Sequence, residues 1–215
     1  MHILTGMLST AVATLFAVAS TGAVGEALRR AKGTLSRDRV RLFALLSATI
    51  FAAQMLNWPI PGGTSAHFVG GALAGILLGP AAGVLAMTVV VGVQGVLFAD
   101  GGLVVLGANV WNMAVVNVLV GYFAYRLLAD RHETAAVFAA GTVGVTAAAL
   151  FAGLQLGASA AFDYRLVETV STMTATHAAL GVVEGLLTVG AVRFFRAAGA
   201  PAAFDVESDD AEVSA

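Results

Sequence analysis

The chain has 215 residues, of which 59% are hydrophobic and only 11% are charged, and its mean hydropathy is +0.89. A soluble domain has about a quarter of its residues charged, so this composition excludes a water-soluble globular protein. The formal net charge of −2 excludes a nucleic-acid partner, and the absence of cysteine excludes disulfides and thiolate metal sites.

Apolar stretches separated by short turns fill most of the chain. They cover residues 7–28, 40–56, 66–79, 82–99, 103–128, 134–157 and 168–195. Because a helix needs about 20 apolar residues to span the hydrocarbon core, the pattern predicts an all-α integral membrane protein. We expect a bundle of seven transmembrane helices over residues 1–198.

The first stretch resembles a secretory signal because Ala17-Val18-Ala19 is similar to a cleavage site. A signal peptide carries positive charge before its apolar run, whereas the basic residues Arg29, Arg30 and Lys32 follow this one. We therefore interpret it as a retained helix. The single lysine, Lys32, follows Ala31 and not the glycine of a phosphate-binding loop, which excludes ATP hydrolysis by that route.

The third stretch is short for a span, since 14 helical residues rise only about 21 Å. It is either a half-helix or part of one kinked helix over 66–99. With seven crossings and the N-terminus outside, 10 of the 11 Lys and Arg residues lie on the inner side and only Arg165 lies outside. The positive-inside rule thus favours seven crossings, with the N-terminus outside and the C-terminus in the cytoplasm of a multi-pass cell-membrane protein.

The composition becomes acidic after residue 198. Residues 199–215 end in FDVESDDAEVSA, which is typical of a disordered cytoplasmic tail.

Polar side chains at membrane depth indicate where a site could lie, because each costs free energy unless protein or water satisfies it. They are Gln54, Gln94, Asn109, Asn112, Asn117, Gln155, His177 and Glu184. For Gln54 and Gln155, near the ends of their segments, we favour a hydrogen bond that only holds the bundle together. Frequent small residues, such as Gly71 and Gly75 or Ala13 and Ala17, predict close packing within the bundle.

The N-terminal Met-His offers a metal three nitrogens: the amine of Met1, and the amide and imidazole of His2. Deprotonating an amide requires a strongly Lewis-acidic ion that accepts planar nitrogen donors, which favours Ni, Cu(II) or Co. The topology places His67 on the same outer side, where it could be a fourth donor. Histidine is too large for efficient removal of the preceding methionine, so Met1 should stay. A histidine at position 2 is more often accidental than functional, and the spacing alone indicates a site only weakly.

Four blocks of sequence, spread from residue 1 to about 195, carry a specific resemblance. They are MHILTGMLS, SAHFVGGALAGILLGPAAGVL, GGLVVLGANVWNMAVV and THAALGVVEGLL. In this order they resemble the nickel/cobalt-specific substrate-binding components (S components) of energy-coupling-factor (ECF) transporters, the CbiM/NikM family.

The resemblance implies a seven-helix subunit that captures Ni(II) or Co(II) with high affinity. It implies metal bound in a plane by the Met1 amine, the His2 amide and imidazole, and His67. Ser65, Asn109 and His177 are candidates to support these ligands. The implied partners are a coupling membrane subunit (T component), ATPase subunits and a small accessory membrane subunit. That accessory subunit is fused in some relatives, and 215 residues leave no room for it.

Two observations leave alternatives open. Many relatives begin Met-His-Ile-Pro-Asp-Gly, whereas Leu4 and Thr5 stand here, which puts the details of this loop in doubt. His177 and Glu184 are seven residues apart on one helix face, which would also suit the proton relay of a stand-alone secondary metal transporter. No HExxH, Ser/His/Asp or paired-carboxylate pattern predicts an enzyme.

Overall fold

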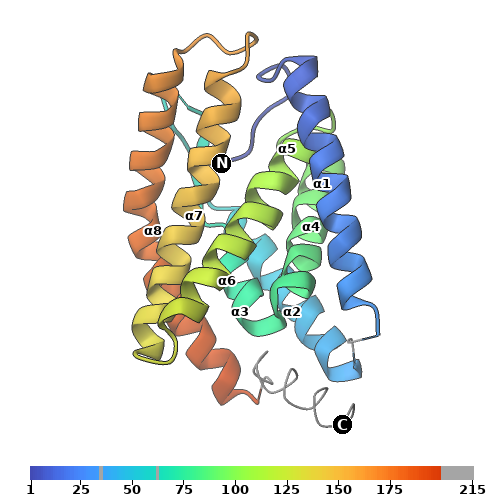
Figure 1. Ribbon diagram of the computed structural model, residues 1–215, viewed down its shortest axis with the longest axis vertical. Helices are drawn as coiled ribbons and strands as arrows, with labels where there is room; N and C mark the ends of the chain where they lie inside the picture. The colour runs from blue at the N-terminus through green and yellow to red at the C-terminus, as the bar shows by residue number, and fades with distance from the viewer. Residues whose placement is uncertain (34–35, 62, 200–215) are drawn as a thin grey trace.

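The computed structural model describes residues 1–33, 36–61 and 63–199, and this part of the chain is a bundle of helices (Figure 1). The elements in chain order are α1 (Thr10–Ala31), α2 (Arg37–Gln54), β1 (Asn57–Pro59), β2 (Ser65–His67), α3 (Gly71–Leu78), α4 (Pro80–Leu97), α5 (Leu106–Val110), the π-helix η1 (Trp111–Val116), α6 (Asn117–Leu128), α7 (Glu133–Gly157) and α8 (Leu166–Ala197). The segments α5, η1 and α6 form one continuous helix of 23 residues. The acidic tail predicted over 199–215 lies, from residue 200 on, outside the described residues.

Among the described residues, five helices are long and apolar enough to cross a membrane: α1, α4, the continuous helix α5-η1-α6, α7 and α8. Helix α2 has 18 residues and carries Arg37, Asp38, Arg39 and Arg41 at its start. Helix α3 has 8 residues, which rise about 12 Å and do not cross a bilayer on their own. The helical membrane class is confirmed, and α3 is the element that falls short of a full span.

The predicted helix over 66–79 begins only at Gly71. Ahead of it, β2 pairs antiparallel with β1, with Ala66 opposite Trp58, so the fold contains a small sheet besides its helices. Proline and glycine residues between 59 and 63 favour this extended turn over a helix. Gly70 then adopts a left-handed conformation, φ 76°, that lets the chain turn into α3.

Small residues bring neighbouring helices into backbone contact, as the sequence predicted. A Cβ atom at Gly185 of α8 would lie 2.6 Å from the carbonyl oxygen of Phe138 in α7. A Cβ at Gly107 of α5 would lie 2.4 Å from Cα of Ala17 in α1. Neither position has room for a side chain, so van der Waals packing of these glycines fixes how closely the helices approach.

Buried amides link the elements inside the bundle. Asn112 of η1 and Gln155 of α7 exchange two hydrogen bonds of 2.8 and 2.9 Å. The amide of Gln54 at the end of α2 donates to the Val69 carbonyl at 2.6 Å. The expected hydrogen bonds are present, from Gln155 to the helix that carries Asn112 and from Gln54 to the loop ahead of α3.

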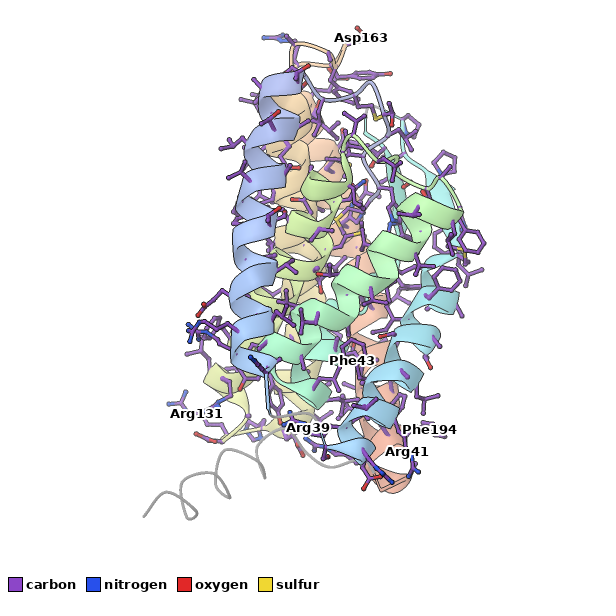
Figure 2. The ribbon with its side chains drawn as sticks, turned by 90° about the vertical axis from the view of Figure 1, so that its right-hand side faces the viewer. Arg39, Arg41, Phe43, Arg131, Asp163 and Phe194 are labelled. Carbon is purple, nitrogen blue, oxygen red and sulfur yellow. The ribbon has the colours of Figure 1, made fainter. Side chains whose placement is uncertain are left out.

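The two ends of the bundle differ in charge. Arg39, Arg41 and Arg131 lie at one end, and Asp163 lies at the other (Figure 2). Helix α1 begins at the end that carries Asp163, and α8 finishes at the basic end (Figure 1). Helix α1 therefore begins, and helix α8 finishes, at opposite ends of the bundle.

Candidate metal centre

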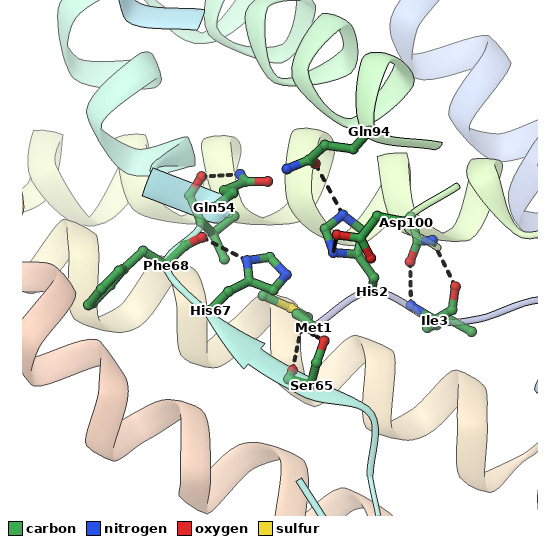
Figure 3. Close-up of polar contacts among 11 residues, drawn as sticks. Met1, His2, Ile3, Gln54, Ser65, His67, Phe68, Gln94 and Asp100 are labelled. Carbon is green, nitrogen blue, oxygen red and sulfur yellow. Dashed lines mark hydrogen bonds and ion pairs between the residues drawn. The ribbon is translucent and has the colours of Figure 1, made fainter. Parts of the chain in front are cut away.

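The first residues of the chain run into the bundle and form part of its core. Met1, His2 and Ile3 are each at most 1% exposed. Asn109 of α5 holds this segment by its main chain: Ile3 N donates to Oδ1 at 2.8 Å, and Nδ2 donates to the Ile3 carbonyl at 3.0 Å (Figure 3). This two-point contact satisfies both backbone groups of Ile3 and fixes the residue beside it, His2.

The N-terminal amine of Met1 is buried against β2. It donates to the carbonyl oxygen of Ser65 and, at 2.8 Å, to the Ser65 hydroxyl. Burial holds the pKa of this amine well below its usual value, with the charge of Asp100 acting in the opposite direction. The amine therefore favours its neutral form, whose lone pair can bind a cation.

The imidazole of His2 uses one nitrogen to fix its orientation. Nε2 lies 3.1 Å from the side-chain oxygen Oε1 of Gln94 in α4. An amide oxygen can only accept, so Nε2 carries the proton, and in a neutral ring Nδ1 is then a bare lone pair. Burial, followed by the charge of the N-terminus, lowers the pKa of His2 to about 3, so the ring is neutral at physiological pH.

The imidazole of His67 also has one nitrogen held by a hydrogen bond and the other free as a lone pair. Its ring stacks on that of His2, with centroids 4.6 Å apart and planes at 23°. Nδ1 lies 2.7 Å from the Phe68 carbonyl and must donate to it, which leaves Nε2 as the lone pair. Burial also holds the pKa of His67 well below its usual value.

The two lone pairs are the distinctive feature of this site. Nδ1 of His2 and Nε2 of His67 are both buried and have no hydrogen-bond partner. An unsatisfied buried polar atom is rare in a native protein because it costs about 1–3 kcal/mol, and here two belong to stacked rings beside a buried amine. The structure thus brings together the three residues predicted as ligands: Met1, His2 and His67.

The residues predicted to support the ligands lie around this cluster. Ser65 contacts the Met1 amine, and Asn109 holds the main chain of Ile3, not an imidazole. His177 of α8 binds the Met173 carbonyl through Nδ1 at 2.9 Å, and its Nε2 is unpaired. His177 is close enough to His67 for an electrostatic interaction between the two rings.

Three contacts of this site were not predicted from the sequence. Gln94 had been noted only as a polar residue at membrane depth, and the Phe68 carbonyl carries no sequence pattern. Asp100 carries no prediction from the sequence, yet its Oδ2 lies 3.4 Å from Nδ1 of His2. The turn Asp100-Gly101-Gly102 is the one signal that could have drawn attention to this place.

Both glycines of that turn are required because it packs against the N-terminal segment. A Cβ at Gly101 (φ 91°) would lie 2.4 Å from Nδ2 of Asn109, and a Cβ at Gly102 (φ 81°) would lie 2.0 Å from the Thr5 hydroxyl. Side chains rarely adopt these left-handed conformations, so a substitution is strained as well as crowded.

We expect Gly101→Ala to lower the stability of the protein by about 1–3 kcal/mol, because it combines backbone strain with a clash against Asn109. Thermal unfolding in detergent measures the effect. Gly92→Ala is the matched control, since a Cβ at Gly92 in α4 meets nothing within 4 Å and alanine favours the helix. Equal unfolding temperatures for the two variants would contradict the assigned role of Gly101.

Glu184 of α8 holds the loop that carries His67. Its carboxylate oxygens accept from the backbone N–H groups of Val69 and Gly70, both at 2.9 Å. These groups precede α3, so a carboxylate here also complements the positive end of the helix dipole. Within the described residues no hydrogen bond or ion pair joins Glu184 to His177, which binds the Met173 carbonyl instead.

The donor set depends on main-chain nitrogen. Across residues 1–33, 36–61 and 63–199, no group of three His, Cys, Asp or Glu side chains is placed to hold a metal ion. Two imidazoles alone make a weak site. The amine of Met1 and the amide of His2 are the nitrogens that would complete four donors.

The chain is similar to known proteins over most of its length. The chain matches the family CbiM, described as the cobalt uptake substrate-specific transmembrane region, over residues 2–201. A protein of Archaeoglobus fulgidus that carries the provisional name fused nickel transport protein NikMN is 54% identical over 198 residues, which are 92% of this chain and 66% of that relative. This chain therefore spans just under two thirds of that relative's length.

Two further proteins extend the comparison. The cobalt transport protein CbiM of Sorangium cellulosum is 34% identical over 162 residues, which are 71% of each chain. A crystal structure described as a transition metal transporter superposes with a TM-score of 0.88 at 32% identity, covering 92% of this chain and 93% of that one. Because the family match runs over nearly the whole helical part of the chain, from His2 to residue 201, the chain belongs to the CbiM family of cobalt-uptake transmembrane proteins.

Proposed function

We propose that this protein captures Ni(II) or Co(II) with high affinity through four nitrogens. The donors are the Met1 amine, the His2 amide after loss of its proton, Nδ1 of His2 and Nε2 of His67. Nitrogen donors of this kind suit both ions, and the names of the relatives include nickel and cobalt transport. The metal is the transported substrate, and the chain is not an enzyme.

The observation that carries the proposal is the pair of unpaired, buried imidazole nitrogens beside a buried amine. Each ring already has its other nitrogen fixed, by Gln94 or by the Phe68 carbonyl. A metal-ligating histidine typically has its second nitrogen held in this way, which sets the tautomer before the metal arrives.

We further propose that the chain is the substrate-binding subunit of an ECF-type importer in the cell membrane. It would act with a coupling membrane subunit, separate ATPase subunits and a small accessory membrane subunit. The basic end of the bundle, with Arg39, Arg41 and Arg131, would face the cytoplasm (Figure 2). The N-terminal site would then receive metal from outside.

Elemental analysis of the purified protein with a native N-terminus and a C-terminal tag tests the capture step. We expect one nickel or cobalt ion per chain. The absence of stoichiometric metal after incubation with either ion would refute the site. In liposomes, we expect uptake only when the coupling and ATPase subunits are present, and uptake by this chain alone under a proton gradient would instead favour the secondary transporter.

The pH dependence of nickel binding should be shallower than that of a free Met-His peptide. In the peptide, the amine and the imidazole have pKa values of about 8 and 6.5, and both lose protons before the metal binds. In the protein both pKa values are lowered by burial, so only the amide proton remains to be displaced near neutral pH. Affinity falls with falling pH in both cases.

Competition titrations between about pH 7.5 and about pH 5.5 measure this difference. We expect roughly a tenfold loss of affinity per pH unit in the protein, for one released proton, and a steeper loss in the peptide. A slope in the protein as steep as that of the peptide would contradict the neutral amine and imidazole.

A further inference from the structure

A cavity of about 320 Å³ opens beside the candidate metal centre. It is lined by His2, Leu4, Asn57, Pro59, Thr64, Ser65 and Asp100. Two of these residues, His2 and Thr64, each have a buried polar atom without a hydrogen-bond partner, which is Nδ1 of His2 and the hydroxyl of Thr64. The cavity therefore combines a candidate metal donor with oxygen atoms that can hydrogen-bond to water.

Asp100 is the acidic residue of this cavity. Its side chain is 23% exposed, and its Oδ2 lies 3.4 Å from Nδ1 of His2 (Figure 3). In the described part of the chain no Lys or Arg forms a salt bridge with Asp100. The carboxylate thus faces both the outer opening and the donor atoms, without a side-chain cation to neutralise it.

The position of Asp100 is fixed by its backbone. Its N–H donates to the carbonyl of Gln94 at 3.0 Å, and the glycine turn that follows packs against Asn109 and Thr5. The same helix end therefore supplies Gln94, which orients His2, and the carboxylate beside that ring. Such fixed placement is what an electrostatic role needs, because the charge does not have to reorganise when an ion arrives.

The charge of the loaded centre gives Asp100 a further role. A divalent ion bound by a neutral amine, two neutral imidazoles and one deprotonated amide leaves one positive charge in a buried place. A single carboxylate beside it makes the whole site neutral, which removes much of the cost of burying the ion. Oδ2 of Asp100 lies 3.4 Å from Nδ1 of His2, so the carboxylate is next to one of the proposed donor atoms.

We propose that Asp100 recruits the hydrated divalent cation into this cavity and balances the charge of the bound metal. The inference rests on the proposed capture of Ni(II) or Co(II). Asn57, Thr64 and Ser65 supply hydrogen-bonding groups to the water shell, and Asp100 supplies the attraction. The ion then passes from oxygen contacts in the cavity to the nitrogen donors.

The test compares Asp100→Asn with the wild type, using NiCl₂ and CoCl₂ as probes and the full chain with a native N-terminus. Calorimetry gives affinity, and stopped-flow mixing gives the association rate at low and high ionic strength. We expect Asp100→Asn to lose roughly tenfold or more in affinity and to associate more slowly, with a weaker dependence on salt. Asp163→Asn removes an exposed carboxylate from the same end of the bundle and should change neither quantity.

Asp100→Glu separates charge from packing, since it retains the carboxylate in a longer side chain. We expect it to regain most of the affinity lost in Asp100→Asn. Binding by Asp100→Asn at the wild-type rate and affinity would overturn the inference while leaving the four-nitrogen site intact. Equal losses in Asp100→Glu and Asp100→Asn would also overturn it, because they would indicate a packing role. A wild type that binds neither ion would refute the proposed function itself.

Discussion

Adding a single glycine before Met1 is expected to abolish nickel capture. The added residue converts the amine into an ordinary amide, which removes one donor and breaks the chelate formed with the amide and imidazole of His2. It also has to enter a buried place, because Met1 is fully buried against Ser65. Calorimetry should show an affinity at least three orders of magnitude lower, roughly 4 kcal/mol in binding free energy.

Two controls separate the loss of the amine from other effects. The same glycine added at the C-terminus should leave binding unchanged. A formyl group retained on Met1, by inhibiting deformylase during bacterial expression, blocks the amine with only two added heavy atoms and should abolish binding as well. Nickel bound as tightly by either N-terminally blocked protein as by the native one would exclude the amine as a ligand.

The second large effect is expected for His67→Ala. This change removes the fourth nitrogen and leaves the N-terminal chelate without the ring stacked on it. The loss of a direct ligand should exceed the roughly 10- to 100-fold loss typical when an outer partner of a ligand is removed. Equilibrium dialysis with nickel measures the affinity, and thermal unfolding of the metal-free protein checks that the bundle still forms.

His132→Ala provides the matched control for His67→Ala. His132 precedes α7 and is exposed, so its removal should leave nickel binding unchanged. The nickel affinity of His177→Ala should lie between those of His67→Ala and His132→Ala, because His177 lies near His67 but is not assigned as a donor. A His67→Ala protein that binds nickel like the wild type would remove His67 from the site.

The helical architecture could be predicted from the sequence because long apolar runs and their charged ends obey simple rules of transfer to a membrane. These rules do not predict where the short helix α3 begins. The sequence predicts a helix from residue 66, but β2 pairs with β1, and Val69 and Gly70 donate hydrogen bonds to Glu184, so the helix begins only at Gly71. The hydrogen bonds to Glu184 join residues more than a hundred positions apart and leave no local pattern in the sequence.

In the candidate site, too, some residues could be predicted from the sequence and others could not. Met1, His2 and His67 could be named from the nitrogen donors that they offer, from the expected topology and from the resemblance to the CbiM/NikM family. Gln94 and Asp100 could not be assigned, because their role depends on which way the end of α4 faces. The direction of the Asn109 side chain, toward Ile3 and not toward an imidazole, follows from the packing of α5 and likewise has no local signature.

The hydrogen bonds that hold the first three residues form late during synthesis, because their partners lie far along the chain. Ser65, Gln94 and Asn109 hold Met1, His2 and Ile3 across separations of 64, 92 and 106 residues. At translation rates of about 5–20 residues per second, the ribosome needs roughly 5–20 seconds to make the last of these partners. During that time the start of the nascent chain is unprotected and open to aminopeptidases and acetyltransferases. The large side chain of His2 discourages removal of Met1. It therefore preserves the Met1 amine until α5, which carries Asn109, has been made and the amine is buried.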